Sequence, residues 1–260
     1  MKKVLGLVSC FLPVMLFAQS PFDGTWKTNL SESKLSQKPY VYLVNNGMYN
    51  CESCAPKINN VKADGQDQPV TGQTYDTIAV QVTDTSTIHV TGKKAGKTEF
   101  EQTRTASQDG KMLTISSTIY PADGSQPFKA EIKLIRVSEG PGGSNANSGS
   151  WRIQNINEDV AGLTTTWKSS GGGLSVSTST GYGWEAKLDG KENPVKGTYA
   201  NNTVSLKQLG DRSIEATYKR DGKIESVEKI TVSPDGKKMT TVADNKLTGR
   251  ISTYIAEKAN

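Results

Sequence analysis

The tetrapeptide Gly24-Thr25-Trp26-Lys27 occurs a second time as Gly149-Ser150-Trp151-Arg152, 125 positions later in the chain. The residues that follow each copy also match, at shifts of 125 and then 126 positions. The matched pairs include Lys62 and Lys187, Asp64 and Asp189, Gly65 and Gly190, Pro69 and Pro194, Ile88 and Ile214, Thr91 and Thr217, Gly96 and Gly222, and Asp109 and Asp235. A repeat of this length in two copies indicates a duplicated domain, because a solenoid needs three or more short stacked units.

Both halves alternate apolar and polar side chains with a period of two. Ile88 and Val90 share one face of a segment, as do Ile214, Ala216 and Tyr218, while Thr, Ser, Lys and Glu fill the opposite faces. This pattern is typical of an antiparallel sheet with one solvated side. Asp-Gly pairs, which favour tight hairpins, separate the segments at Asp64-Gly65, Asp109-Gly110, Asp123-Gly124, Asp189-Gly190, Asp221-Gly222 and Asp235-Gly236.

The sequence therefore predicts an all-β chain built from two tandem domains, at residues 21–138 and 149–260. Each half has about eight runs between turns, and a long meander removes its exposed edges by closing. We expect two antiparallel up-and-down β-barrels, whose interiors have room for side chains or for one small ligand. Residues 139–148 are rich in Gly, Ser and Asn, which predicts a flexible linker.

The first 18 residues have the pattern of a secretory signal peptide. Lys2 and Lys3 precede an almost unbroken apolar run from Val4 to Ala18, and that run is too short to span a bilayer comfortably. We expect cleavage after Ala18, with an uncleaved membrane anchor as the alternative. The mature chain has no other long apolar stretch, so we predict no membrane span there and a periplasmic or extracellular location.

The charge of the chain argues against a nucleic-acid partner. The formal net charge of +5 falls to +3 when Lys2 and Lys3 are removed, and both signs are interspersed without a basic block. Such a surface does not follow a phosphate backbone. The apolar fraction of 34% is below the roughly 45–50% of typical domains, which indicates small cores or partly polar inner faces.

The segment from Phe22 to Lys27, followed by Ser31-Glu32-Ser33, resembles the opening of calycins, the superfamily of lipocalins and fatty-acid-binding proteins. The chain is also similar to exported bacterial proteins with tandem lipocalin-like repeats. The resemblance implies that Gly24 with Trp26, and Gly149 with Trp151, close the base of each barrel. It also implies that a basic residue of the last strand packs over an indole, a role that falls to Arg136 in the first half. Arg136 ends a stripe of one parity formed by Phe128, Ala130, Ile132 and Leu134.

Two departures from that superfamily restrict what the resemblance implies. Fatty-acid-binding proteins hold the ligand carboxylate with an Arg-x-Tyr pair, but the comparable stretch here is Arg136-Val137-Ser138. Fatty acid is therefore not carried over as the ligand. In the second half, the parity of Arg250 is ambiguous, so its basic residue over the indole stays open.

Cys51 and Cys54 are the two cysteines outside the signal segment. Two thiols three positions apart in a turn predict a disulfide in an oxidising compartment. A redox role would require a helix N-terminus, covalent haem would require a histidine at position 55, and zinc would require further ligands. We therefore expect a structural disulfide, with neither a metal nor a cofactor.

Groups suited to catalysis are scarce. His89 is the sole histidine and is out of phase with its apolar neighbours, so we expect it to face water. The carboxylate pairs Glu99 with Glu101 and Glu225 with Glu228 lie on charged strands, and we interpret them as solvated faces. The sequence thus favours a protein that is not an enzyme.

Arg104, Phe100, Trp167 and Trp184 are the candidate ligand contacts. Arg104 shares the inward face with Phe100, and a buried cation in a cavity usually meets an anion. Trp167 and Trp184 either pack at a barrel mouth or form a stacking platform for a sugar or flat apolar molecule. The leading hypothesis is an exported binding protein that holds a small, partly apolar molecule. The alternative is a structural or adhesive envelope module that binds protein or glycan through its outer faces.

Overall fold

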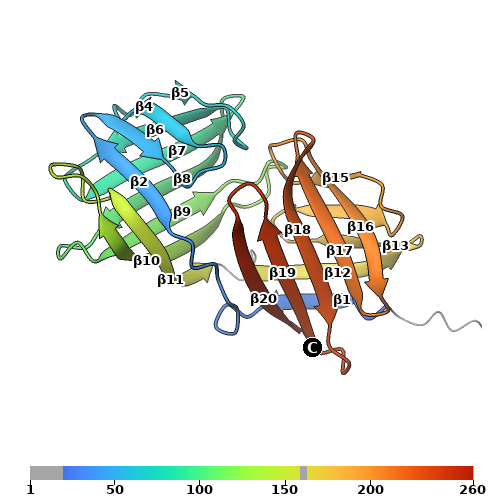
Figure 1. The fold of residues 1–260 in the computed structure, drawn as a ribbon. Helices are drawn as coiled ribbons and strands as arrows, with labels where there is room; N and C mark the ends of the chain where they lie inside the picture. Colours follow the sequence, from blue (N-terminus) through green and yellow to red (C-terminus); the bar gives the residue numbers. More distant parts are fainter. Residues whose placement is uncertain (1–19, 159–162, 260) are drawn as a thin grey trace, which may run out of the picture.

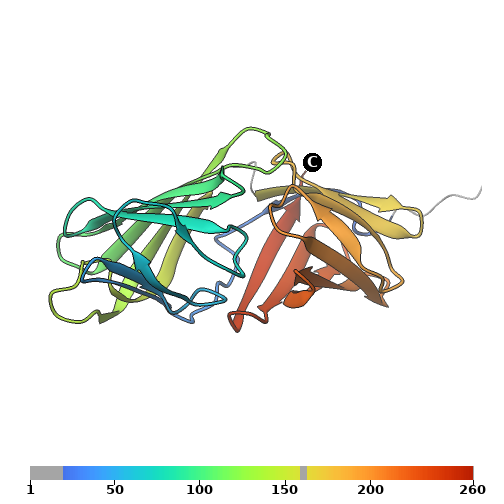
Figure 2. The ribbon, with the colours of Figure 1, turned by 90° about the horizontal axis from the view of Figure 1, so that it is seen from above.

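A computed structural model describes residues 20–158 and 163–259 of the chain, and the predicted signal peptide 1–18 lies outside this part. The fold is all-β, as the alternating pattern predicted, and consists of two ten-stranded antiparallel sheets that lie side by side (Figure 1). A second view at right angles shows each sheet curled on itself (Figure 2). Within the described residues, no helix is long and apolar enough to cross a membrane.

Each repeat contributes ten strands. The first repeat provides β1 (Gly24–Thr28), β2 (Tyr40–Asn45), β3 (Met48–Cys51), β4 (Ile58–Lys62), β5 (Gln68–Pro69), β6 (Thr77–Val82), β7 (Thr87–Lys94), β8 (Lys97–Ala106), β9 (Met112–Ile119) and β10 (Phe128–Glu139). The second provides β11 (Gly149–Glu158), β12 (Thr164–Ser170), β13 (Gly173–Ser177), β14 (Gly183–Lys187), β15 (Asn193–Lys196), β16 (Asn202–Gly210), β17 (Ser213–Arg220), β18 (Lys223–Val232), β19 (Lys238–Asn245) and β20 (Arg250–Lys258). The sequence predicted about eight strands in each half. This number is too low because a strand as short as β5, which has two residues, shows no alternation of apolar and polar side chains.

The two repeats exchange their first strands. β1 pairs with β12 and β20 of the second repeat, with Thr25 opposite Thr166. β11 pairs with β10 and β2 of the first repeat, with Ser150 opposite Val41. Figure 1 shows β1, in blue, beside β12 in the C-terminal sheet. The N-terminal sheet therefore contains β2–β11, and the C-terminal sheet contains β1 and β12–β20.

This exchange differs from the predicted division into residues 21–138 and 149–260 by one strand on each side. The reason is that β1 and β11 carry the same Gly-x-Trp motif followed by a basic residue. Either strand therefore suits either sheet, and local pattern cannot decide between the two pairings.

The two sheets close to different extents. The C-terminal sheet is a closed barrel, because β1 pairs on one side with β12 and on the other with β20. In the N-terminal sheet, β4 and β5 are the terminal strands of the hydrogen-bonded order. The segment after β4 nevertheless returns to β6, where the Gly65 amide donates to the Val80 carbonyl at 2.8 Å and Asp64 forms a bridge with Gln81.

The predicted linker 139–148 is not a flexible connection between domains. It is the turn between β10 and β11, which pair with each other inside the N-terminal sheet. Asn147 and Ser148 are fully buried. Arg136 donates through Nη1 to the Ser148 carbonyl and through Nη2 to the Ala146 carbonyl, both at 2.7 Å. These buried bonds fix a segment whose composition alone indicated a flexible linker.

The two motif tryptophans occupy equivalent places in the two sheets. Trp26 and Trp151 are both fully buried. Each indole Nε1 donates to a carbonyl four residues earlier, from Trp26 to Phe22 at 2.8 Å and from Trp151 to Asn147 at 3.0 Å. Because of the exchange, each tryptophan belongs to the core of the other repeat's sheet.

A basic side chain covers each indole. The Arg136 guanidinium carbon lies 4.0 Å from the Trp151 ring centroid, so this residue covers the tryptophan of the second motif. The equivalent group over Trp26 is Lys258, whose Nζ lies 5.2 Å from the ring centroid. The sequence left open which basic residue of the second half covers an indole, and this residue is Lys258. Arg250 stacks instead on Tyr40, at 4.0 Å.

We expect Arg136→Ala to destabilise the N-terminal sheet by about 2–4 kcal/mol, because it leaves three buried or half-buried carbonyls without a charged donor. These carbonyls belong to Gly110, Ala146 and Ser148. Lys258→Ala is the matched control, and removal of its exposed cation should cost only about 0.5–1 kcal/mol. Urea unfolding, followed by hydrogen exchange in peptides from β9–β11, measures the difference. Equal losses in the two variants would contradict this role for Arg136.

Candidate ligand-binding site

The interior of the C-terminal barrel contains a cavity of about 390 Å³. Apolar and aromatic side chains dominate its lining, with a few polar groups among them. The lining side chains that bear on the chemistry of the site are Trp167, Trp184, Tyr182, Tyr218, Met239 and Glu228. A concave, mostly apolar space with a few convergent polar groups is the usual form of a small-molecule site.

Trp167 and Trp184 form one wall of this cavity. Trp167 comes from β12 and Trp184 from β14, and their rings meet edge to face with centroids 5.5 Å apart. Phe22 stacks on Trp167 at 6.1 Å, and the Trp167 Nε1 donates to the Thr165 hydroxyl at 3.1 Å. Among the described residues, the buried Nε1 of Trp184 has no hydrogen-bond partner. Ring contacts and one hydrogen bond thus hold this wall together, and within the described residues the Trp184 N–H is left without a partner.

Two tyrosines stand beside Trp184. Tyr182 precedes β14 and Tyr218 lies on β17, and both side chains line the cavity. Burial raises the pKa of Tyr182 to about 12 and holds that of Tyr218 well above its usual value. The Trp184 N–H is near both hydroxyls but not in hydrogen-bonding geometry. The tyrosines thus stay neutral and present a polar edge to the cavity.

Glu228 contradicts the interpretation of its carboxylate pair as a solvated face. It lies on β18 with the same parity as Ile230 and Val232, which are both buried, and so its side chain enters the barrel. Burial raises the pKa of Glu228 to about 7. Its neighbour Glu225 also lines the cavity and lies 3.6 Å from Arg220.

The first carboxylate pair is divided between a buried and an exposed position. The Glu99 carboxylate accepts a bond from the Thr74 hydroxyl at 2.6 Å, and burial raises its pKa. Glu101 is exposed and accepts a bond from the Tyr120 hydroxyl at 2.9 Å. The solvated interpretation thus holds for Glu101 and is wrong for Glu99.

The N-terminal sheet encloses Arg104, as its parity predicted. The guanidinium is 8% exposed, donates through Nε and Nη2 to Gln102 and through Nη1 to the Tyr49 hydroxyl, and lies 4.6 Å from the Tyr42 ring centroid. Phe100, on the same face, belongs to the packed interior. Its ring meets Tyr75 edge to face at 5.2 Å.

A second cavity, of about 560 Å³, lies where the two sheets face each other. Arg104, Tyr40 and Tyr42 line it from the N-terminal sheet, and Arg250, Tyr254 and Glu228 from the C-terminal barrel. Glu225, Ser226, Glu228 and Tyr254 line both cavities. The barrel interior and the space between the sheets therefore meet at these four residues.

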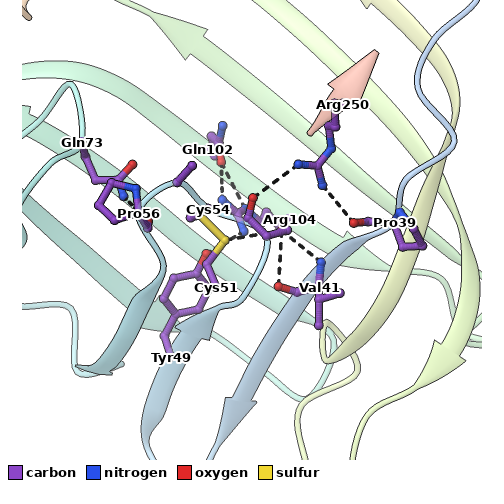
Figure 3. The surroundings of a disulfide bond; sticks show 12 residues. Pro39, Val41, Tyr49, Cys51, Cys54, Pro56, Gln73, Gln102, Arg104 and Arg250 are labelled. Atoms are coloured by element: carbon purple, nitrogen blue, oxygen red, sulfur yellow. Dashed lines mark hydrogen bonds between the residues drawn. A yellow bond between two sulfur atoms is a disulfide. The ribbon is translucent and has the colours of Figure 1, made fainter. Parts of the chain in front are cut away.

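The predicted disulfide between Cys51 and Cys54 is present and borders this second cavity (Figure 3). Two arginines of the C-terminal barrel bind carbonyls of its loop. Arg250 donates to Ser53 at 3.4 Å and also to Pro39 at 2.9 Å, and Arg220 donates to Ala55 at 2.9 Å. The disulfide loop is thus a contact between the two sheets.

The outer face of the N-terminal sheet carries a groove of about 790 Å³. His89 lies in it, exposed as predicted, with Nδ1 3.0 Å from the Thr103 hydroxyl. The groove is lined by hydroxyl, amide and charged groups of β7–β11, including Thr91, Thr103, Ser116, Thr118, Glu101, Glu131 and Asn157. In the described part of the chain, no three His, Cys, Asp or Glu side chains gather in a group that could hold a metal ion.

The sequence-predicted contacts are thus divided between different places. Trp167 and Trp184 come together in the barrel cavity, Arg104 lines the space between the sheets, and Phe100 packs in the first core. Sequence reasoning missed Glu228, although its parity with Ile230 was a usable signal. No protein-family model matches the chain, and neither a curated protein nor a solved structure matches it.

Proposed function

We propose that this chain is an exported, non-enzymatic binding protein that holds one small, partly apolar molecule inside its C-terminal barrel. The observation that carries this proposal is the cavity of about 390 Å³ walled by the Trp167–Trp184 pair. Its volume lies in the range of about 300–1,000 Å³ that is usual for small-molecule sites. The unpaired N–H of Trp184 offers such a molecule one directed hydrogen bond.

The N-terminal sheet supports the proposal by contrast. Phe100 covers Gly92 so closely that a Cβ there would lie 2.3 Å from the ring. In the second repeat, the equivalent positions hold Ser226 and Tyr218, which pair across β17 and β18. The ring of this pair thus lies on β8 in the first repeat and on β17 in the second, so the position equivalent to Phe100 is small, and Ser226 there lines both cavities.

We expect the neutral fluorescent probe N-phenyl-1-naphthylamine to bind with one-to-one stoichiometry and to quench tryptophan emission by energy transfer. Ser226→Phe, which copies the first repeat's residue, should weaken probe binding at least about ten-fold by occupying the mouth of the cavity. Lys229→Phe adds the same ring to an exposed position of β18 and should leave binding unchanged. A probe that binds equally to all three proteins would contradict the site.

A second candidate function is a module that binds glycan or protein through its outer face. The groove of about 790 Å³ on β7–β11 favours it, because its hydroxyl and carboxylate lining suits a polar partner. Retarded migration in gels that contain a soluble polysaccharide, together with no uptake of the neutral probe, would favour this function over the first.

A further inference from the structure

We infer that the C-terminal barrel selects an organic cation, with the ligand's ammonium group at Glu228 and its apolar body against Trp167 and Trp184. This inference rests on the proposed function and specifies the chemical class of the ligand. It starts from Glu228, whose carboxylate lines the cavity and has neither an ion-pair nor a hydrogen-bond partner within the described residues. Glu228 is half-buried; a carboxylate partly removed from water without a partner is costly, and a cationic ligand offsets that cost.

The internal repeat shows what a partnered version of this position looks like. At a shift of 126 positions, Glu228 corresponds to Gln102, and Ile230 corresponds to Arg104. In the first repeat, Arg104 donates twice to the Gln102 side chain. In the second repeat, a carboxylate takes the place of the amide, and the basic residue two positions away is replaced by isoleucine. The two interiors therefore have opposite charge, and only the C-terminal one suits a cation.

The nearby basic side chains are engaged elsewhere. Arg220 lies 3.6 Å from Glu225 and donates to the Ala55 carbonyl. Arg250 stacks on Tyr40 and donates to two carbonyls around the disulfide loop, although its buried Nε has no partner in the described chain. Burial raises the pKa of Glu228, and within the described residues the ion pair of Arg220 is with Glu225 and not with Glu228.

The aromatic lining supplies the rest of a cation site. Trp167, Trp184, Tyr182 and Tyr218 line the same cavity as Glu228. The faces of such rings carry negative potential and attract organic ammonium groups, most strongly when water is excluded. The unpaired Trp184 N–H additionally suits an ether, carbonyl or hydroxyl oxygen on the ligand. A small aryl or alkyl amine with one such acceptor satisfies both features.

The pH dependence of binding follows from the groups that face Glu228. Tyr182 and Tyr218 stay neutral because burial raises their pKa values. Tyr254 and Glu225 line the same space, and Arg104 and Arg250 line the cavity between the sheets. With a pKa of about 7, Glu228 is neutral in mild acid and charged in mild alkali. A cation that stays protonated should therefore bind more tightly as the pH rises through neutrality, with release of a proton.

A matched probe series tests the charge class. By titration calorimetry at about pH 8, 1-naphthylmethylamine should bind at least about ten-fold more tightly than the neutral 1-naphthylmethanol, and 1-naphthylacetate should bind most weakly. Glu228→Gln, which copies the first repeat's residue, should abolish the advantage of the amine and leave the neutral probe unchanged. Glu185→Gln, which removes a carboxylate from the exposed face of β14, is the matched control and should retain the advantage. At about pH 5.5, the advantage should be lost in the native protein.

The outcomes separate the inference from the function on which it rests. If the neutral and charged probes bind equally, or if Glu228→Gln changes nothing, the cation inference is overturned while the binding function stands. Tightest binding of 1-naphthylacetate would overturn it in favour of an anion site at Arg104 and Arg250. If no probe binds and Ser226→Phe also has no effect, the proposed function itself fails.

Discussion

Replacing Trp26 by alanine will destabilise the C-terminal barrel, whereas replacing Trp151 will destabilise the N-terminal sheet. Each indole is fully buried in the core of the sheet formed mainly by the other repeat. Loss of a buried tryptophan costs about 3–5 kcal/mol, through lost burial and the cavity left behind. Each variant also leaves one carbonyl, at Phe22 or Asn147, without its indole donor.

Hydrogen exchange with peptide mapping shows which sheet loses stability in each variant. In Trp26→Ala, exchange should accelerate across β12–β20 and stay slow in β2–β10. In Trp151→Ala, the order should reverse. Leu206→Ala and Leu113→Ala remove fully buried side chains from the C-terminal and N-terminal cores respectively, and they calibrate the exchange pattern of each sheet. If Trp26→Ala instead loosened β2–β10, the strands would not be exchanged.

Pairs of introduced cysteines will test the exchange of β1 and β11 between the sheets, because a disulfide forms only between strands that lie side by side. Thr25 and Thr166 are directly opposite in the β1–β12 pair, and their hydroxyl oxygens lie 3.3 Å apart. In Thr25→Cys/Thr166→Cys, oxidation should therefore join β1 to β12 within one chain, because the side chains are already in contact. The reciprocal pair Val41→Cys/Ser150→Cys should also close.

Thr25→Cys/Val41→Cys is the decisive control, since this pair would be opposite only if β1 returned to its own repeat. It should remain reduced in the monomer. Proteolytic mapping under non-reducing conditions identifies each bridge, with Cys51–Cys54 as an internal reference. A crosslink in the control pair and none in Thr25→Cys/Thr166→Cys would refute the exchange of strands between the two sheets. Disulfide-linked dimers would show instead that strands pass between molecules.

Local pattern in the sequence was sufficient for the all-β class, for the two-sheet organisation and for the inward direction of Arg104. Each depends on side-chain parity or on turn residues, which are encoded within a few positions. The partners of β1 and β11 could not be predicted in this way. Both strands present the same motif to the same kind of neighbour, so the choice depends on how the chain crosses between the sheets.

The candidate site was predictable only in part, for a related reason. Trp167 and Trp184 could be identified from residue type alone, because large aromatic side chains commonly line small-molecule sites. Glu228 could not be identified in this way, because several charged residues of β18, such as Lys229, face solvent. Within the described part of the chain, Glu228 has no basic ion-pair partner, and this depends on what surrounds it in three dimensions. The buried turn at 139–148 was missed likewise, because its order comes from Arg136 on β10.

The far separation of β1 from its partners affects how the polypeptide acquires its shape during synthesis. The strands β2–β11 are consecutive, so the N-terminal sheet can form once the chain up to residue 158 is free to fold. β1 emerges first, yet one of its partners is the last strand, where Thr28 meets Ala256. A contact so distant along the chain forms slowly. The earliest strand to be made is therefore among the last to dock, and until then its tryptophan is open to chaperones and to neighbouring molecules.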